Sequence, residues 1–217
     1  MIGMPIRLPS YALLLYYCIL SQIVLLLQAL YAIGEHMNIF YLDPHPKTCA
    51  EMHISKHVVK MIIEYAQLMS TAHRVIDGEE YIDASSGRKI KRWRLDDERE
   101  QSLMKASHIN HPSAIWCRIT LSNYAWLYRM WLHLLEEYTF RYGKIHACAR
   151  LKDALRFPPN KITIGDFTEP TPAMPNDIKI PGNSLASYHN YYNISKRSFA
   201  TWQGRINSRP TPTWYTV

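Results

Sequence analysis

Polar and apolar positions alternate with a helical period between Glu51 and Arg74, in the stretch EMHISKHVVKMIIEYAQLMSTAHR. The stretch has no Gly or Pro and is long enough for about six helical turns, so it predicts a helix. At about 100° per residue, six polar side chains fall on one stripe roughly 80° wide. These residues are His53, His57, Lys60, Glu64, Gln67 and Thr71.

Apolar residues border this polar stripe on both sides. Ile54, Met61, Tyr65 and Leu68 lie on one flank, and Val59, Ile63 and Ala66 lie on the other. An ordinary surface helix has one apolar face and one broad polar face. Singly, a buried histidine or an exposed Lys60–Glu64 pair would be an ordinary structural feature. Burying several ionisable groups together would cost several kcal/mol, so we favour a catalytic role for His53, His57, Lys60 and Glu64.

The whole pattern predicts a mainly α fold: one compact domain with two long helices, short helices and irregular Pro-rich connections. Thr48 is a candidate cap for the first long helix, and the Asp77-Gly78 turn ends it. The second long helix is predicted from Pro112, a favoured first helical residue, to about Tyr142, with Gly143 as its C-cap.

Shorter elements fill the rest of the domain. Short helices are predicted at about 96–107 and 184–193. The stretch 84–94 is predicted to be a charged loop. The segment 158–181 contains six prolines and is predicted to be an irregular surface segment.

The N-terminal extension, residues 1–36, differs from the rest of the chain. Residues 11–34 carry no charge and meet the length criterion for a membrane-spanning helix. The extension is a membrane anchor, a cleaved signal peptide or an untranslated upstream region. Gly34-Glu35-His36-Met37 can be encoded as GGA-GAA-CAT-ATG, a ribosome-binding site before a start codon, so we favour a start at Met37. The domain 37–217 is then expected in the host cytoplasm, and at a membrane only if residues 11–34 are translated.

A basic excess indicates an acidic partner for this domain. The net charge is +7, and residues 37–217 keep all of it because Arg7 and Glu35 cancel. Nucleic acid, as duplex DNA, is the first expectation, with no obligate protein partner. Cations interleaved with aromatic residues suit phosphate contact and base stacking. The candidate nucleic-acid-binding residues are Arg74, Arg92, Trp93, His111, Tyr191, Tyr192, Lys196, Arg197 and Trp202.

Cysteine usage indicates a reducing compartment. The domain has an odd number of cysteines, Cys49, Cys117 and Cys148, and no CxxC pair. This pattern argues against a disulfide framework and against a structural zinc site. We expect no metal and no other cofactor.

The order of elements resembles the pyrimidine-dimer DNA glycosylase family, the small all-helical phage repair enzymes of the endonuclease V type. The resemblance spans most of residues 37–217. It rests on Ala50-Glu51-Met52-His53, on the aromatic helix between His111 and Gly143, and on Tyr191, Tyr192 and Lys196 followed by an Arg-Pro-Thr…Trp-Tyr string. The chain also resembles uncharacterised phage proteins that share a KHVVKM…E.AQL.STAHR block.

This resemblance implies cleavage of the glycosidic bond of a damaged base by an amine nucleophile, through a Schiff base and with help from a glutamate. The family's amine is the α-amine of a small residue exposed by methionine removal. Here Asn38 follows Met37, and a residue of that size leaves the methionine in place. Without gaps the family's glutamate aligns with Lys60, and Glu64 lies one turn further on.

Three functions stay open. The first is a DNA-repair glycosylase and lyase acting on damaged pyrimidines, with Glu64 as acid or base, Lys60 or the α-amine as nucleophile, and His53 and His57 as orienting or proton-transfer groups. The second is a metal-dependent hydrolase or nuclease that uses His53, His57 and Glu64. The third is a non-catalytic nucleic-acid-binding phage protein whose polar stripe is a buried network.

Overall fold

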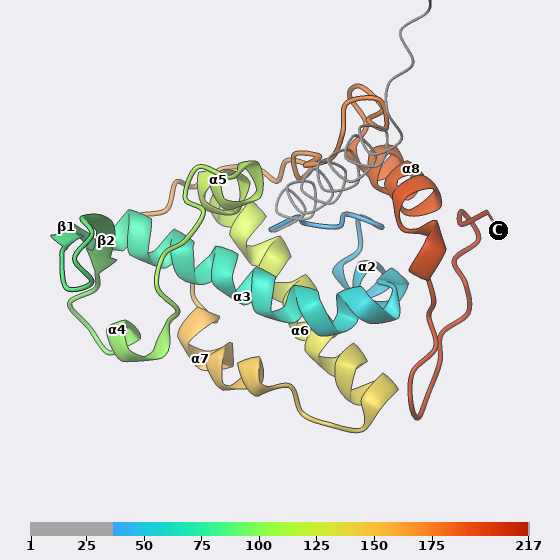
Figure 1. Cartoon of the computed structure of the whole chain (residues 1–217), viewed down its shortest axis with the longest axis horizontal. Helices are drawn as coiled ribbons and strands as arrows, with labels where there is room; N and C mark the ends of the chain where they lie inside the picture. The colour runs from blue at the N-terminus through green and yellow to red at the C-terminus, as the bar shows by residue number, and fades with distance from the viewer. Residues whose placement is uncertain (1–36, 217) are drawn as a thin grey trace, which may run out of the picture. The chain divides into compact units, whose positions relative to one another are not determined.

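Two crossed helices form the centre of the domain. The computed structural model describes residues 37–216, which belong to one compact unit beginning at Met37. Helix α3 (Ser55–Asp77) lies across helix α6 (Leu121–Tyr142), as Figure 1 shows. Trp131 of α6 is fully buried and donates its indole N–H to the carbonyl of Ile62 on α3 at 2.9 Å. The prediction of a mainly α fold is confirmed.

The first predicted helix is divided in two. Helix α2 (Pro46–Met52) ends before His53, and α3 begins at Ser55. The backbone of His53 and Ile54 is extended between them. The N–H and the hydroxyl of Ser55 both donate to the carbonyl of Thr201. The C-terminal segment therefore provides the hydrogen-bond acceptor for the first N–H group of α3. The prediction of one unbroken helix from Glu51 was therefore wrong, because the break depends on a residue far along the chain.

Thr48 was also expected to begin the first helix and does not. Helix α2 starts at Pro46, with His45 at its N-cap and no side-chain cap. Proline at the first helical position lacks an N–H that would otherwise be unsatisfied.

The charged segment after α3 forms a hairpin, where a loop was predicted. Strand β1 (Glu79–Asp83) pairs antiparallel with β2 (Ile90–Arg94), with Glu79 opposite Arg94 and Tyr81 opposite Arg92. The acidic first strand thus faces the basic second strand. Ion pairs join Lys91 to Glu80, Arg92 to Asp83 and Arg94 to Glu79.

The predicted second long helix is interrupted at Thr120. Helix α5 (Pro112–Ile119) ends there, and the extended backbone of Thr120 starts α6 with its hydroxyl accepting from the N–H of Asn123. The prediction of a continuous helix from Pro112 was wrong because a threonine cap competes with helix continuation. Gly143 closes α6 in the left-handed conformation, at φ 66°, as expected.

The remaining elements lie around this centre. They are α4 (Arg99–Ser102), the 3₁₀ turn η1 (Ala147–Leu151), α7 (Lys152–Leu155), α8 (Ser184–Ser195) and the 3₁₀ turn η2 (Arg197–Phe199). The hairpin lies at one end of α3, and α8 with the C-terminal segment lies at the other (Figure 1). Residues 158–181 contain no helix or strand, as predicted.

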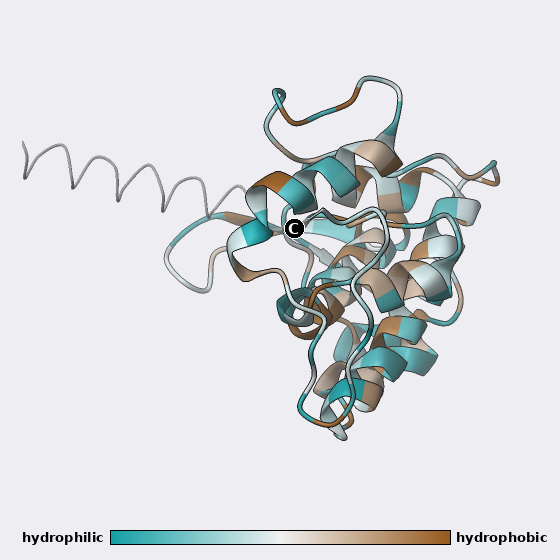
Figure 2. Ribbon diagram, turned by 90° about the vertical axis from the view of Figure 1, so that its right-hand side faces the viewer, coloured by the Kyte–Doolittle hydropathy of each residue, from teal (hydrophilic) through white to brown (hydrophobic). Residues whose placement is uncertain are grey.

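Polar and apolar segments alternate along the helices (Figure 2), and the long helices α3 and α6 each have a buried face. The three described cysteines are buried and free. No helix between Met37 and Thr216 is long and apolar enough to cross a membrane. The uncharged stretch 11–34, on which the membrane-anchor hypothesis rests, lies outside the described residues.

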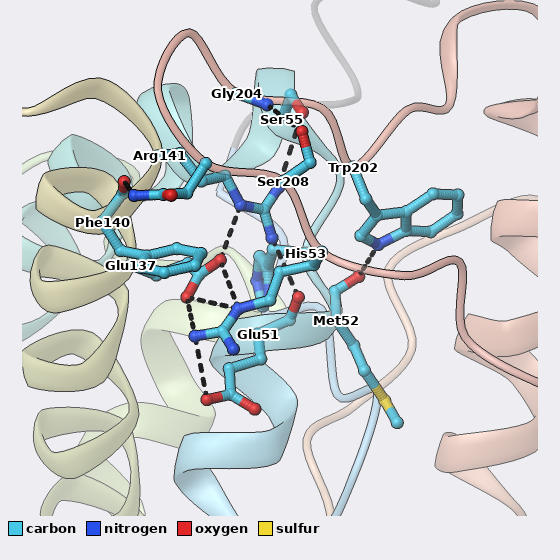
Figure 3. A network of polar contacts seen from close by, with 12 residues as sticks. Glu51, Met52, His53, Ser55, Glu137, Phe140, Arg141, Trp202, Gly204 and Ser208 are labelled. Atoms are coloured by element: carbon cyan, nitrogen blue, oxygen red, sulfur yellow. Dashed lines mark hydrogen bonds and ion pairs between the residues drawn. The ribbon is translucent and has the colours of Figure 1, made fainter.

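A buried ion network fastens the C-terminal segment to the core (Figure 3). The carboxylate of Glu137 on α6 accepts from Arg141 at 2.6 Å and from Arg209 at 2.9 Å. Arg141 is fully buried and also donates to the carbonyl of Glu51 at 2.9 Å. Trp202 donates its indole N–H to the carbonyl of Met52 at 2.7 Å. These contacts hold residues 200–209 against α2 and α6.

Candidate functional site

The carboxylate of Glu64, midway along α3, is the centre of the candidate site. The residue is only 9% exposed. Its Oε1 lies 3.2 Å from the Nζ of Lys60, and its Oε2 accepts from the backbone nitrogen of Met37 at 2.9 Å. The side chain of Lys60 is 46% exposed, so the carboxylate lies at the border between core and solvent. The site therefore joins two predicted catalytic residues to the first residue of the domain.

The segment 37–42 positions that nitrogen. All six of its residues are buried. The amide of Asn38 accepts from the Tyr188 hydroxyl at 2.6 Å, and the N–H of Phe40 donates to the Tyr65 hydroxyl at 3.2 Å. Because both ends of these bonds are in the core, the nitrogen beside Glu64 has a fixed place and needs no rearrangement to reach the carboxylate.

His57 lies one turn before Lys60 and faces inward. Its ring stacks on Phe40 with centroids 4.1 Å apart, and its Nδ1 lies 2.7 Å from the Tyr192 hydroxyl. Burial lowers the pKa of His57 well below its ordinary value, and the nearby positive charge of Lys196 lowers it further. The imidazole is therefore neutral at neutral pH. A neutral ring against the N-terminal segment is suited to positioning that segment.

His53 lies deeper and does not reach the carboxylate of Glu64. It donates from Nδ1 to the carbonyl of Cys49 at 2.8 Å, so its Nε2, 2.9 Å from the hydroxyl of Tyr65, acts as the acceptor. Burial lowers the pKa of His53 to about 4. Tyr65 in turn accepts from Phe40, so His53 supports the N-terminal segment through an intermediate hydroxyl.

The far end of the polar stripe holds a loop in place. Gln67 donates to the carbonyl of Lys105 at 2.7 Å, and the hydroxyl of Thr71 lies 3.4 Å from the carbonyl of Ser107. These bonds fix the chain between α4 and α5 on the surface of α3. The stripe predicted as one feature therefore holds neighbouring segments at each end and has the Lys60–Glu64 ion pair between them.

Five of the predicted nucleic-acid-binding residues lie in the interior: Arg74, Tyr191, Tyr192, Lys196 and Trp202. The guanidinium of Arg74 donates to the carbonyls of Met104, Trp93 and Leu103 and to the carboxylate of Glu100. Lys196 donates to the hydroxyl of Tyr191 at 3.1 Å. In this conformation these five side chains contact other parts of the protein. Any contact with nucleic acid at the surface must therefore come from other residues.

The other four keep some exposed surface: Arg92, Trp93, His111 and Arg197. Arg92 and Trp93 lie on β2, where Arg92 pairs with Asp83 at 3.8 Å. His111 accepts from the N–H of Ser113 and caps α5. Arg197 borders a surface cavity of about 540 Å³ against the C-terminal segment. The structure does not bring these four together with Glu64 into one group.

Sequence reasoning missed Tyr188 and assigned Tyr192 to nucleic acid, although both hold the N-terminal segment. Tyr188 and Tyr192 of α8 contact Asn38 and His57 across sequence separations of 150 and 135 residues. Separations of that size leave no local pattern. The available signal was the tyrosine spacing along α8, which suits one buried helix face.

No three His, Cys, Asp or Glu side chains in residues 37–216 come together as candidate metal ligands. His53 and His57 direct ring nitrogens to Cys49, Tyr65 and Tyr192. A comparison with protein-family models finds no match, and comparisons with curated proteins and with solved structures find no significant match. The function is therefore argued from this site.

Proposed function

We propose that the domain is a DNA glycosylase with lyase activity on damaged pyrimidines, with Glu64 as its acid and base group. One observation carries the proposal: the backbone nitrogen of Met37 lies 2.9 Å from the carboxylate of Glu64. With translation starting at Met37, this nitrogen is a primary α-amine held beside a carboxylate. An amine next to a proton acceptor is the arrangement that Schiff-base chemistry requires.

The α-amine is a better nucleophile here than the amine of Lys60. An α-amine has an ordinary pKa of about 8 and a lysine amine one of about 10.4. At neutral pH about a tenth of α-amines are therefore unprotonated, against fewer than about one lysine amine in a thousand. Burial can activate a lysine, but the side chain of Lys60 is about half exposed. Lys60 is better suited to holding the carboxylate of Glu64 and contacting a phosphate.

The reaction uses these groups in sequence. The lone pair of the α-amine attacks C1′ of the damaged nucleotide, the glycosidic bond breaks, and the base leaves with the bonding electrons and takes up a proton from water. Glu64 accepts one proton from the attached amine and passes it to the ring oxygen O4′ as the sugar ring opens to an iminium at C1′. Loss of a proton from C2′ then expels the 3′ phosphate, and water hydrolyses the iminium to release the amine.

Charge supports DNA as the partner. The chain carries a net charge of +7, and cations gain affinity for DNA by releasing its counterions. Lys60 places one cation directly at the site. A base inside a duplex is out of reach of a protein amine, so the damaged nucleotide must leave the stack before attack.

Borohydride trapping tests the proposal. Protein starting at Met37 is incubated with a duplex that contains a thymine dimer, and sodium borohydride reduces any iminium to a stable adduct. We expect an adduct on the tryptic peptide Met37–Lys47. An adduct on Lys60 would instead block cleavage after Lys60, which mass spectrometry distinguishes.

Two variants serve as matched tests. Glu64→Gln should abolish trapping, whereas Glu136→Gln, an exposed glutamate on α6, should trap like the parent. A protein that keeps an uncleaved peptide before Met37 should not trap. Trapping that persists with the blocked terminus would contradict the α-amine assignment, and no trapping on ultraviolet-damaged duplex would contradict the function.

A further inference from the structure

The solvent-facing strip of α3 beside the candidate site has an unusual composition. Lys56, Val59, Lys60 and Ile63 are its exposed residues, and they fall within about 100° of the helix circumference. Val59 is 42% exposed and Ile63 is 49% exposed. Solvent-facing positions of a helix are ordinarily polar, so two large aliphatic side chains side by side at i and i+4 form a small unpartnered apolar surface.

Exposed lysines lie beside this aliphatic pair. Lys56 and Lys60 line one side of it, and Lys105 is exposed next to Gln67, where the loop crosses α3. In the described part of the chain Lys56 has no ion-pair partner, and its Nζ lies 4.5 Å from the ring centroid of Phe199. An apolar surface bordered by lysines is complementary to a chain of phosphates with apolar groups between them.

We infer that Val59 and Ile63 enter the duplex at the damaged nucleotide and occupy the space that the extruded base leaves. This inference rests on the proposed function, because it places the strip against the DNA that Glu64 acts on. Lys60, on the same strip as Ile63, lies 3.2 Å from the carboxylate of Glu64, so a nucleotide displaced at this strip lies next to the carboxylate. Apolar side chains inserted in this way unstack and kink a duplex.

The two side chains suit insertion. Valine and isoleucine hold essentially one rotamer on a helix, so they lose little conformational entropy when they become buried. They project from a helix whose other faces pack against the core, and a rigid support transmits force to the base stack. Lys56 and Lys60 lie on the same strip and contact the phosphates on either side of the opened step.

The experiment measures the opening of the base stack separately from cleavage of the glycosidic bond. Protein starting at Met37 with Glu64→Gln is titrated against a thymine-dimer duplex and against the undamaged duplex, each with 2-aminopurine opposite the site. Unstacking raises the fluorescence of 2-aminopurine. We expect a rise with Glu64→Gln alone. Adding Ile63→Ser should remove most of the rise and lower the ratio of damaged to undamaged affinity about five- to tenfold.

Three controls make the result decisive. Ile145→Ser changes an isoleucine that is 82% exposed beyond the end of α6, and it should leave both readouts unchanged. Lys56→Gln should weaken binding to both duplexes alike and lower the salt slope by about one. Circular dichroism confirms that each variant is folded.

The outcomes separate the insertion from the proposed function. Unchanged fluorescence and affinity ratio in Ile63→Ser, with trapping intact in the parent, would overturn insertion and leave the glycosylase standing. A fluorescence rise that depends on Ile63 without any trapping would support insertion and overturn the chemistry. Loss of self-association by DNA-free Ile63→Ser would assign the strip to a protein interface and overturn insertion.

Discussion

Glu64 on α3 and Glu137 on α6 are both buried carboxylates, and each pairs with a cation one helical turn away. Replacing each by glutamine should nevertheless have opposite consequences. Glu64→Gln should abolish trapping and leave the stability of the domain nearly unchanged. Glu137→Gln should destabilise the domain severely and lower activity only through unfolding.

The surroundings of the two cations set these magnitudes. Arg141, the partner of Glu137, is fully buried, and Arg209 loses the same acceptor. Leaving a buried charge without its counter-ion costs about 3–5 kcal/mol. Lys60, the partner of Glu64, keeps 46% of its side chain in solvent and stays hydrated without the carboxylate. The Met37 nitrogen also donates to Glu64, but the side-chain carbonyl oxygen of glutamine can still accept that hydrogen bond. We therefore expect Glu64→Gln to cost only about 1 kcal/mol.

Thermal unfolding followed by tryptophan fluorescence measures the melting temperature of both variants under the same conditions, and trapping is assayed well below each melting temperature. For a domain of this size about 1 kcal/mol corresponds to about 2–4 °C in Tm. Glu137→Gln should therefore melt about 6–20 °C lower than the parent, and Glu64→Gln within about 4 °C. Equal loss of stability in the two variants would refute the reasoning, because Glu64 would then be as structural as Glu137.

Two further predictions follow from charge and burial. Burial lowers the pKa of His53 and of His73 to about 4, so the folded state binds fewer protons than the unfolded state below about pH 6.5. The free energy of unfolding should fall as the pH falls through that window, by about 2 kcal/mol for each histidine at pH 5. Urea titrations at pH 7 and pH 5 measure this change in the free energy of unfolding. His133→Gln is the control, because His133 is partly exposed. A free energy of unfolding that does not change with pH would contradict the burial argument. For DNA binding, replacing both Arg88 and Lys89 at the hairpin tip by glutamine should lower the slope of log affinity against log salt by about two, and an unchanged slope would remove the hairpin from the interface.

Local patterns predicted the elements of the fold better than their ends. The helical period around α3 and the glycine cap after Tyr142 depend on neighbouring residues, and both appear where expected. The break before Ser55 depends on the carbonyl of Thr201, which no local pattern contains. The hairpin was missed because its cations indicated a solvated loop, whereas they pair across the strands with Glu79, Glu80 and Asp83.

The candidate site was predictable in part for the same reason. Helical spacing alone placed Lys60 next to Glu64, and the structure has them 3.2 Å apart. Helical spacing could not distinguish these two residues from His53 on the same stripe, because burial is decided by distant partners such as Tyr65. Nor could helical spacing show that the guanidinium of Arg74 donates its hydrogen bonds to loop carbonyls, which leaves it buried and away from any ligand.

Under the proposed function, the polar stripe of α3 supports a chain terminus at Met37. A terminal amine is ordinarily the most mobile group of a protein, and chemistry at a fixed carboxylate requires it to be held. His53 and His57 supply that constraint: one orients Tyr65, which accepts from Phe40, and the other stacks directly on the ring of Phe40. Their low pKa values keep both rings uncharged, so neither competes with the amine for the carboxylate of Glu64. In that function, His53 and His57 act indirectly, by fixing the place of a backbone nitrogen that no side-chain pattern could indicate.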